Sequence, residues 1–356
     1  MLALSFLIAM LAGPVAQPVR ADDPLYLPDD MVQFFEARVD RRLPELQRLE
    51  GIIQTIFSKD GIGFSYSDVT RTAAGVFRTG SGNCLSFTQL VVAIGRYFNL
   101  NVRYREVYVA PTWSKHGPLV VLNQHVNALV SIGGRGYIVD LVPEINRIEI
   151  RGNVVGDERG MAHYFNNLGA EWLAAGNAEQ AVVTFRRSTR VDPTAAFAWA
   201  NLGVALAVLK RDDEAEEMYD RALELDRENL VAMSNLSELC LRHGRDKEAE
   251  ELFKRVEDFR NRNPYYHYSL GLDSLHSDAP LSAVQHFKDA LKRKKKEHRF
   301  YFGLAQAYAQ LGEWDEAIKN LQKARKYAPD EAGRERYSQK LELLASYSSS
   351  QDPTPE

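Results

Sequence analysis

A spacing of 34 residues organises the second half of this chain and limits the folds that it can adopt. Leucine, alanine and large apolar residues each recur at this interval. Such a period is typical of antiparallel helix pairs that stack into a solenoid, because the small residues allow close approach and the large ones fill the space between repeats. The recurring positions are Leu168, Leu202, Leu236, Leu270 and Leu304, then Ala181, Ala215, Ala249, Ala283 and Ala317, and then Phe185, Tyr219, Phe253, Phe287 and Leu321.

The period and the placement of the small and aromatic residues resemble the tetratricopeptide repeat. Five repeats are expected over residues 162–331, with Pro193 and Pro329 closing the first and the last. A charged capping helix is expected over residues 332–345, and a polar, disordered tail over residues 346–356. The resemblance implies an all-α solenoid with a concave face that is built by the first helix of each repeat.

Three asparagines occupy the same position in successive first helices. They are Asn167, Asn201 and Asn235, and they are expected to form a ladder on the concave face. Because asparagine side chains can pair with the backbone amides of an extended peptide, the sequence predicts a protein or peptide partner in this groove. A purely local role for these asparagines is the alternative. Capture of a terminal carboxylate is not predicted, since Arg242 is the one basic residue that can be placed on the face.

In the first half of the chain, a turn rich in glycine and serine leads to a cysteine at the start of an apolar segment. Residues 80–88 read GSGNCLSFT, and the segment from Leu85 to Leu100 is apolar almost all round, which predicts a buried helix. Cys84 would then lie in the first turn, where unpaired N–H groups and the helix dipole favour the thiolate. The alternative is a buried cysteine that packs as a small hydrophobe.

A histidine and an aspartate follow on two predicted strands. Strands are expected over residues 102–110, 124–132 and 137–142, with a loop over residues 111–118. A turn centred between residues 132 and 133 would place His125 directly opposite Asp140 on one face of the sheet. Together with Cys84 they would supply a nucleophile, a base and a carboxylate that orients the imidazole. Taken singly, the histidine is more often structural and the aspartate more often a turn residue.

Residues from about Thr70 to Glu144 resemble a bacterial transglutaminase-like domain. The motifs of that family are a G-x-C block that opens a helix, a histidine that opens a strand and an aspartate on the next strand. They match Gly82-Asn83-Cys84, His125 and Asp140. The resemblance implies a papain-like α+β fold over residues 22–155 and cysteine chemistry at an amide or acyl carbon. The chain departs from the family at Val126-Asn127, where the family commonly has Ala-Trp.

The two domains together predict a cysteine-dependent amide hydrolase or acyl transferase whose repeats hold a protein or peptide partner. The alternative is a catalytically inactive transglutaminase-like fold that acts as an interaction scaffold through its repeats. No cofactor and no metal site are expected, because the histidines are scattered and no metal-binding or nucleotide-binding motif occurs. The net charge of −4, from 44 basic and 48 acidic residues, gives no electrostatic case for nucleic acid.

The chain begins with an apolar run that predicts a secretory signal peptide over residues 1–21. The run from Met1 to Ala12 is ended by Gly13-Pro14, and small residues precede Asp22. We therefore expect an exported, periplasmic protein with no stable membrane span after cleavage. The alternative is a cytoplasmic adaptor whose first residues form a buried helix.

Three further features have a structural interpretation from the sequence. Cys240 takes an apolar position in a first helix and is expected in the core. The run from Lys292 to Lys296 is expected to be a solvated helix end, with a binding patch as the alternative. Residues 145–160 contain three glycines, which permit either a flexible hinge or packing of the repeats against the first domain.

Overall fold

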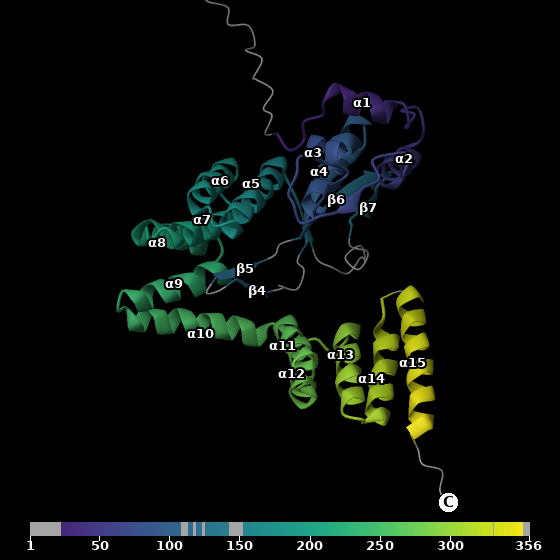
Figure 1. The fold of residues 1–356 in the computed structure, drawn as a ribbon, viewed down its shortest axis with the longest axis vertical. Helices are drawn as coiled ribbons and strands as arrows, with labels where there is room; N and C mark the ends of the chain where they lie inside the picture. Colours follow the sequence, from purple (N-terminus) through teal and green to yellow (C-terminus); the bar gives the residue numbers. More distant parts are fainter. Residues whose placement is uncertain are drawn as a thin grey trace, which may run out of the picture. The chain divides into compact units, whose positions relative to one another are not determined.

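The computed structural model describes residues 23–107, 113–116, 119–122, 125–141, 152–329 and 331–351. Contacts divide the chain into two compact units (Figure 1). The first contains the residues up to Arg103 together with residues 128–141, and the second contains residues 104–127 and everything from Val142 onward. The predicted signal peptide over residues 1–21 lies outside the described residues.

Four helices belong to the first unit: α1 (Asp29–Glu36), α2 (Glu45–Phe57), α3 (Ala73–Thr79) and α4 (Cys84–Tyr97). The predicted break at Pro44 is confirmed, because α2 begins directly after this residue, where proline best fits the start of a helix. The predicted buried helix is α4, and every residue from Leu85 to Gly95 is buried. The short helix α3 was not expected, since its seven residues are too few to show a helical period.

The described strands form three small sheets. The largest has the order β7-β6-β3-β8, and two-stranded sheets join β1 to β2 and β4 to β5. The papain-like α+β fold expected for residues 22–155 is therefore not shown, since the structure contains only these small sheets beside its helices. The strands are β1 (Ser65–Tyr66), β2 (Ser81–Gly82), β3 (Asn101–Val107), β4 (Trp113–His116), β5 (Leu119–Leu122), β6 (His125–Ile132), β7 (Arg135–Val139) and β8 (Gly152–Val155).

The loop expected over residues 111–118 is wrong, because β4 occupies residues 113–116 and pairs antiparallel with β5. The correction has a local cause: Trp113 and the run Leu119-Val120-Val121-Leu122 are strong strand formers. The third predicted strand is also displaced. It lies at residues 135–139, where it pairs antiparallel with β6, instead of at residues 137–142.

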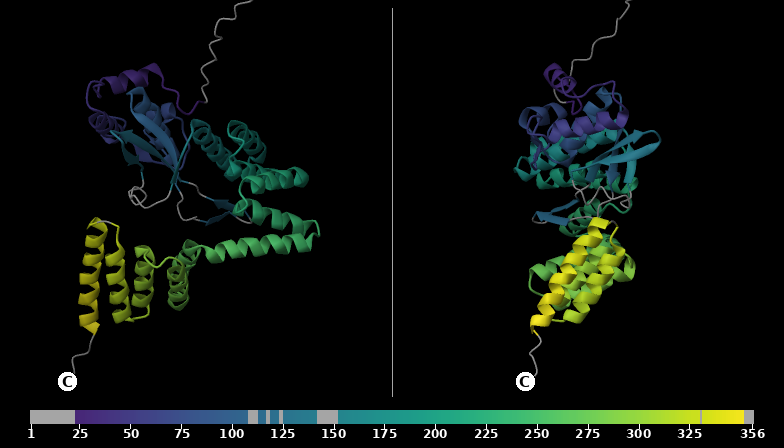
Figure 2. Two further views of the ribbon diagram at one scale, coloured as in Figure 1. Left: turned by 180° about the vertical axis from the view of Figure 1, so that it is seen from behind. Right: turned by 90° about the vertical axis from the view of Figure 1, so that its right-hand side faces the viewer.

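The second unit carries helix pairs in series, as the 34-residue period predicts (Figure 2). Each pair joins a first and a second helix through a short turn, and a longer helix follows the last pair. The pairs are α5 (Asp157–Ala174) with α6 (Ala178–Val191), α7 (Ala196–Val208) with α8 (Asp212–Leu225), α9 (Leu230–Arg242) with α10 (Asp246–Arg262), α11 (Pro264–His276) with α12 (Pro280–Arg293), and α13 (His298–Gln310) with α14 (Trp314–Tyr327), followed by α15 (Glu331–Gln351).

The repeated residues make the core of these pairs. The five recurring alanines are completely buried. In three pairs, the ring of the recurring aromatic residue rests against the recurring glycine of the first helix. A Cβ atom added at Gly169 would lie 2.6 Å from the Phe185 ring, one at Gly203 would lie 2.6 Å from Tyr219, and one at Gly271 would lie 2.5 Å from Phe287. Glycine at this position therefore permits the close contact of ring and helix that larger residues would prevent.

Helix α15 extends to Gln351, six residues beyond the predicted end of the capping helix at residue 345 and into the predicted disordered tail. The reason lies in the sequence, since no glycine or proline occurs between Gly333 and Pro353 to end the helix. Residues 352–356 lie outside the described part of the chain.

Candidate functional site

Cys84 is the first residue of α4 and is half-buried. The preceding Asn83 caps the helix, because its side-chain oxygen accepts hydrogen bonds from the Ser86 N–H at 3.0 Å and the Ser86 hydroxyl at 2.9 Å. The amide of Asn83 in turn donates to the hydroxyl of Thr70 at 2.8 Å. These bonds fix the turn that leads into the helix, so the sulfur lies at the helix start that the sequence predicts.

Tyr66 lies close to this helix start. It is on β1, where it pairs in parallel with Gly82 on β2, two residues before Cys84. Its hydroxyl donates to Asp68 at 2.9 Å. Partial loss of water, this hydrogen bond, the Asp68 charge and the nearby Cys84 thiolate raise the pKa of Tyr66 to about 12. A neutral phenol is therefore a neighbour of the cysteine that sequence reasoning missed.

The hairpin that carries His125 and Asp140 has a different register from the one predicted. Its pairs place Ile132 opposite Arg135 and Ala128 opposite Val139, so the turn consists of Gly133-Gly134. His125 is the first residue of β6, and Asp140 follows β7 directly. Continuing the register would place Asp140 opposite Asn127, so the direct opposition of His125 and Asp140 is wrong. Both glycines have a positive φ, and this fixes the turn one position later than expected.

The predicted site therefore consists of elements whose positions are known one by one. Cys84 and Asp140 lie in the first unit, and His125 lies in the second. The assembly of Cys84, His125 and Asp140 into one catalytic site stays a prediction.

The asparagine ladder lies on the first helices as expected, and all three residues are half-buried. Two of its amides hydrogen-bond within the repeats. Asn201 donates to the side-chain oxygen of Asn166 at 2.9 Å, and Asn235 donates to the carbonyl of Val231 at 2.7 Å. The local role that the sequence left open is thus present for these two amide groups. Binding of a peptide by Asn167, Asn201 and Asn235 stays a prediction.

A buried histidine joins the first repeat to strand β3, and sequence reasoning missed it. His163 on α5 is 3% exposed, and its Nε2 lies 2.6 Å from a carboxylate oxygen of Glu106 on β3. Its ring stacks on Phe197 of α7 with the centroids 4.3 Å apart. The available signal was its place in the repeat, because the equivalent positions, Phe197 and Val231, are apolar.

Arg159 completes this cluster from α5, one turn before His163. Its Nε lies 2.5 Å from Asp192, and its Nη1 lies 3.8 Å from Glu106. Burial alone would raise the pKa of Glu106, but the hydrogen bond from His163 and the charges of His163 and Arg159 outweigh it and lower this pKa. The cluster therefore holds a charged carboxylate between β3 and the first repeat. Residues near 152–163 thus form packed contacts within the second unit.

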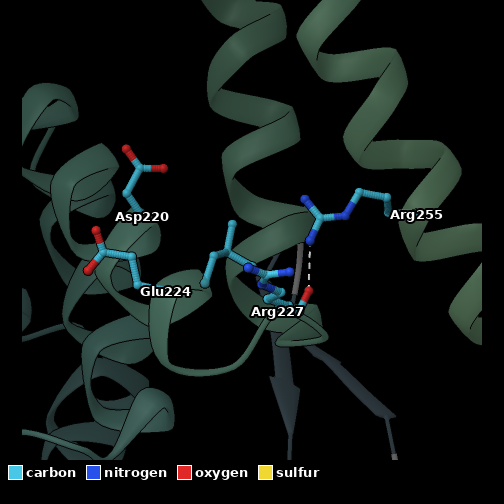
Figure 3. Close-up of a pocket in the computed structure, with 5 residues that line it drawn as sticks. Asp220, Glu224, Arg227 and Arg255 are labelled. Atoms are coloured by element: carbon cyan, nitrogen blue, oxygen red, sulfur yellow. Dashed lines mark hydrogen bonds between the residues drawn. The ribbon is translucent and has the colours of Figure 1, made fainter.

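The hollows on the described surface of the repeats coincide with junctions between successive helix pairs. One is lined by Asp220, Leu223 and Glu224 of α8, by Arg227 and by Arg255 of α10 (Figure 3). Within it, Arg255 donates to the carbonyl of Arg227 at 2.7 Å. Burial, followed by the charges of Glu216 and Glu248, raises the pKa of Asp220.

A second hollow lies one repeat further on and is lined by Asp258, Asn261, Arg262 and Arg293. Here Arg293 donates to the carbonyl of Asn261, which is the counterpart of Arg227. Because the same kind of contact occurs at both places, we interpret these hollows as structural junctions between repeats.

Three cations of the basic run make contacts within the fold. Lys292 pairs with Asp289 at 2.8 Å, and Arg293 donates to backbone carbonyls. Lys294 pairs with Glu297 at 2.7 Å and donates to the Tyr265 hydroxyl at 2.6 Å. Much of this run thus joins α12 to its neighbours. Cys240 is completely buried, which confirms its expected place in the core.

Two searches of the described residues bear on other classes of site. None of the described helices combines the length and the hydropathy that a bilayer span requires. Within the same part of the chain, no group of three or more histidine, cysteine, aspartate or glutamate side chains is placed to hold a metal ion.

Comparison with known families identifies the repeats. Models of the tetratricopeptide repeat match residues 193–262 and residues 275–339. The helix pairs of these regions are therefore tetratricopeptide repeats, and both matches lie outside the transglutaminase-like stretch. No curated protein has a sequence that matches this chain.

Solved structures with similar repeats include three bacterial examples. A MamA double mutant from strain RS-1 has 19% identity and a TM-score of 0.27, over 48% of this chain and 95% of that one. YrrB, described as a tetratricopeptide-repeat protein with an unusual peptide-binding site, has 18% identity and a TM-score of 0.27, over 50% and 92%. PilF of Pseudomonas aeruginosa has 23% identity and a TM-score of 0.29, over 54% and 90%. These scores are below 0.5 and carry no information about the partners of this chain.

Proposed function

We propose that this protein is an interaction scaffold whose tetratricopeptide repeats hold a protein or peptide partner. The observation that carries the proposal is the agreement between two family-model matches and an array of helix pairs with a periodic core. Such arrays present long surfaces on which extended or helical segments of partners bind. The groove side of the first helices, at Asn167, Asn201 and Asn235, is the proposed contact region.

Site-specific photo-crosslinking in the native cell tests this proposal. A photoreactive amino acid at Glu238, an exposed residue one turn after Asn235 on α9, is expected to trap a discrete protein partner. The matched control places the same group at Glu217, an exposed residue on the second helix α8. The scaffold proposal fails if Glu238 yields no adduct beyond those obtained from Glu217.

A second candidate function is cysteine chemistry at an amide or acyl carbon, as hydrolysis or acyl transfer. The observation that favours it is the half-buried Cys84 at the start of a buried helix, held there by its Asn83 cap. The rate of alkylation against pH tests it, with Cys240→Ser as the background. An activated thiolate reacts at mildly acidic pH, and His125→Ala should reduce that rate. A normal thiol titration that His125→Ala leaves unchanged would remove the catalytic candidate.

We also propose that the protein is exported to the periplasm, on the basis of the apolar run at residues 1–12. Fractionation of cells, with amino-terminal sequencing of the mature chain, tests this. Recovery of an uncleaved chain from the cytoplasm would contradict it.

A further inference from the structure

The recurring aromatic residue of the third repeat lies in a different environment from its counterparts. Phe185, Tyr219 and Phe287 are at most 1% exposed, and Leu321 is 3% exposed, whereas Phe253 is 44% exposed. The repeat period assigns all five to one core position. An exposed phenylalanine at this position therefore marks a face of α10 that lacks the cover present in the other repeats.

One cause is the residue that faces this position. In repeats one, two and four the aromatic ring rests on a glycine, where a Cβ atom would come within 2.6 Å of it. The third repeat has Ser237 at the glycine position, completely buried and bonded to the carbonyl of Ser234 at 2.8 Å. Its Cβ atom occupies the space that the ring would need, so Phe253 cannot pack inward as its counterparts do.

A second cause is the missing end signal of α10. Helices α6 and α8 have 14 residues and end at Asp192 and Asp226, whose carboxylates accept the backbone N–H two residues later at 2.9 and 3.0 Å. Such turns stop a helix. The equivalent residue of the third repeat is Arg260, and α10 continues to Arg262 over 17 residues. Helix α11 then starts at Pro264, after the single residue Asn263.

The contacts between α10 and the following pair gather at the end of α10. The carbonyl of Asn261 accepts from Arg293 and lies 3.1 Å from Nε2 of His267, and Arg260 lies over the ring of Tyr266. Phe253 lies two turns earlier. Over the described repeats, the hydrophobic cluster of α6 to α10 and the cluster that starts at Ala283 share no residue. Helix α11 has two buried residues, against eight each in α7 and α9.

The surroundings of Phe253 on α10 are acidic. Glu250 and Glu257, three residues before it and four after it, lie on the same side of the helix and are exposed. This face is continuous with the stacking interface that joins the first three repeats, because Ala249, Leu252 and Val256 of the same helix belong to their core.

We propose that the exposed face of α10 around Phe253 is a docking surface for an amphipathic helix of a partner protein. The other junctions of the array show what this position accepts. There, the first helix of the following repeat covers the ring, as α13 covers Phe287 with Gly303, where a Cβ atom would lie 2.6 Å from the ring. The partner helix presents a small residue to Phe253 and basic residues to Glu250 and Glu257. The inference rests on the scaffold function and names its partner class.

The probe for the test is a fluorescein-labelled peptide of residues 296–311 of this chain, KEHRFYFGLAQAYAQL. It contains α13 with Gly303 and begins with basic residues, so it has the proposed chemistry. Fluorescence anisotropy with the full chain is expected to show saturable binding of one peptide per chain. Phe253→Glu is expected to weaken binding by about tenfold or more, as loss of a central apolar anchor does. A peptide with Gly303→Leu should bind equally poorly.

The matched control is Val183→Glu, which places the same charge at a side chain of α6 that is 54% exposed. It should leave the affinity unchanged. Circular dichroism checks that both variants fold, which exposed positions favour. A second variant, Arg260→Asp with Asn261→Pro, restores the end signal of the first repeat. It should let α11 cover α10 and abolish peptide binding while the fold is retained.

Absence of saturable binding to the native chain, or binding that Phe253→Glu leaves unchanged, would overturn the proposal. Protection of Phe253 by α11 in solution would appear as the first of these results. The scaffold function is read separately, since the crosslinking group at Glu238 lies on α9 and reports the groove side. A failed peptide titration together with a specific adduct at Glu238 would remove the α10 surface and keep the scaffold.

Discussion

The junction between the first and second repeats and the junction between the third and fourth are built from the same period, yet they differ in packing. At the first, Phe185 is 1% exposed and rests on Gly169, and α6 ends at Asp192. At the second, Phe253 is 44% exposed, and α10 runs past the equivalent point. Two substitutions at key positions, Ser237 and Arg260, account for the difference. A repeat array thus keeps its helices while a single junction loses its cover.

The largest expected difference between the junctions is the cost of removing the aromatic ring. Phe185→Ala should lower the free energy of unfolding by about 3–5 kcal/mol, because it leaves a cavity in a packed core. Phe253→Ala should lower it by less than about 1 kcal/mol, as exposed positions do. Urea unfolding followed by far-ultraviolet circular dichroism measures both. Equal losses would show that Phe253 is buried in solution and would remove the comparison.

The second block of repeats has its own electrostatic anchor, which offers the next effect in size. The side chain of Glu297 is 7% exposed and contacts Arg299 at 2.9 Å, Lys294 at 2.7 Å and the Tyr265 hydroxyl at 3.0 Å. Burial alone would raise its pKa, but Arg299 and then Lys294 lower the pKa of Glu297 to about 2. Glu297→Gln should lower the stability of this block by about 2–3 kcal/mol at neutral pH.

The sign of the pH dependence follows from this lowered pKa. The stabilisation by Glu297 is complete above its ordinary pKa of 4.5 and is lost as the pH falls from there to about 2. Hydrogen exchange of α12 and α13, measured between pH 7 and the acid range, separates this block from the first three repeats. Exchange in α6 and α7 should be unaffected by Glu297→Gln. A uniform change over both blocks would show that they unfold as one unit and would weaken the comparison.

A reciprocal exchange of glycine and serine tests the first cause of the difference. At Gly203 a Cβ atom would lie 2.6 Å from the Tyr219 ring and 3.1 Å from the carbonyl of Ala215, so Gly203→Ser should cost about 1–3 kcal/mol through overpacking. Ser237→Gly should cost about 1 kcal/mol, the usual loss for glycine in a helix. The comparison is contradicted if Gly203→Ser is as well tolerated as Ser237→Gly in thermal unfolding.

The sequence predicted the parts of the fold that depend on many residues at once. The 34-residue spacing predicted the helix pairs, and the continuous apolar run after Cys84 predicted the buried helix α4. Elements that rest on a few residues were missed, among them α3 and the short pairs β1–β2 and β4–β5. The hairpin register was wrong by one turn position, because the choice among the glycines at residues 133–136 depends on local backbone energies that the pattern does not contain.

The candidate sites were less predictable than the fold, for a related reason. The spacing placed Asn201 and Asn235 on first helices, but it did not show that their amides bond to Asn166 and to the carbonyl of Val231. The pair of Glu106 and His163 joins residues 57 positions apart, beyond any local period. The period did expose His163, Ser237 and Arg260 as departures from their counterparts. Such departures indicate where to look, while the contacts decide what each one does.

The smallest predicted effect repairs the junction between repeats three and four. Arg260→Asp with Asn261→Pro reproduces the Asp192-Pro193 pair that ends the first repeat. Proline removes the backbone N–H that continues α10, and it also restricts the unfolded chain, which contributes about 0.4–1 kcal/mol of stability at compatible sites. The melting temperature should therefore rise slightly, and the exchange of amides in α11 should slow. Asn261→Pro alone is the matched control, since it stops the helix without the aspartate turn. If the double variant melts earlier than the native chain, the long form of α10 is itself the stable junction, and the open face is a fixed feature of the array. A rise confined to the double variant would instead show that one missing aspartate turn keeps the two blocks apart.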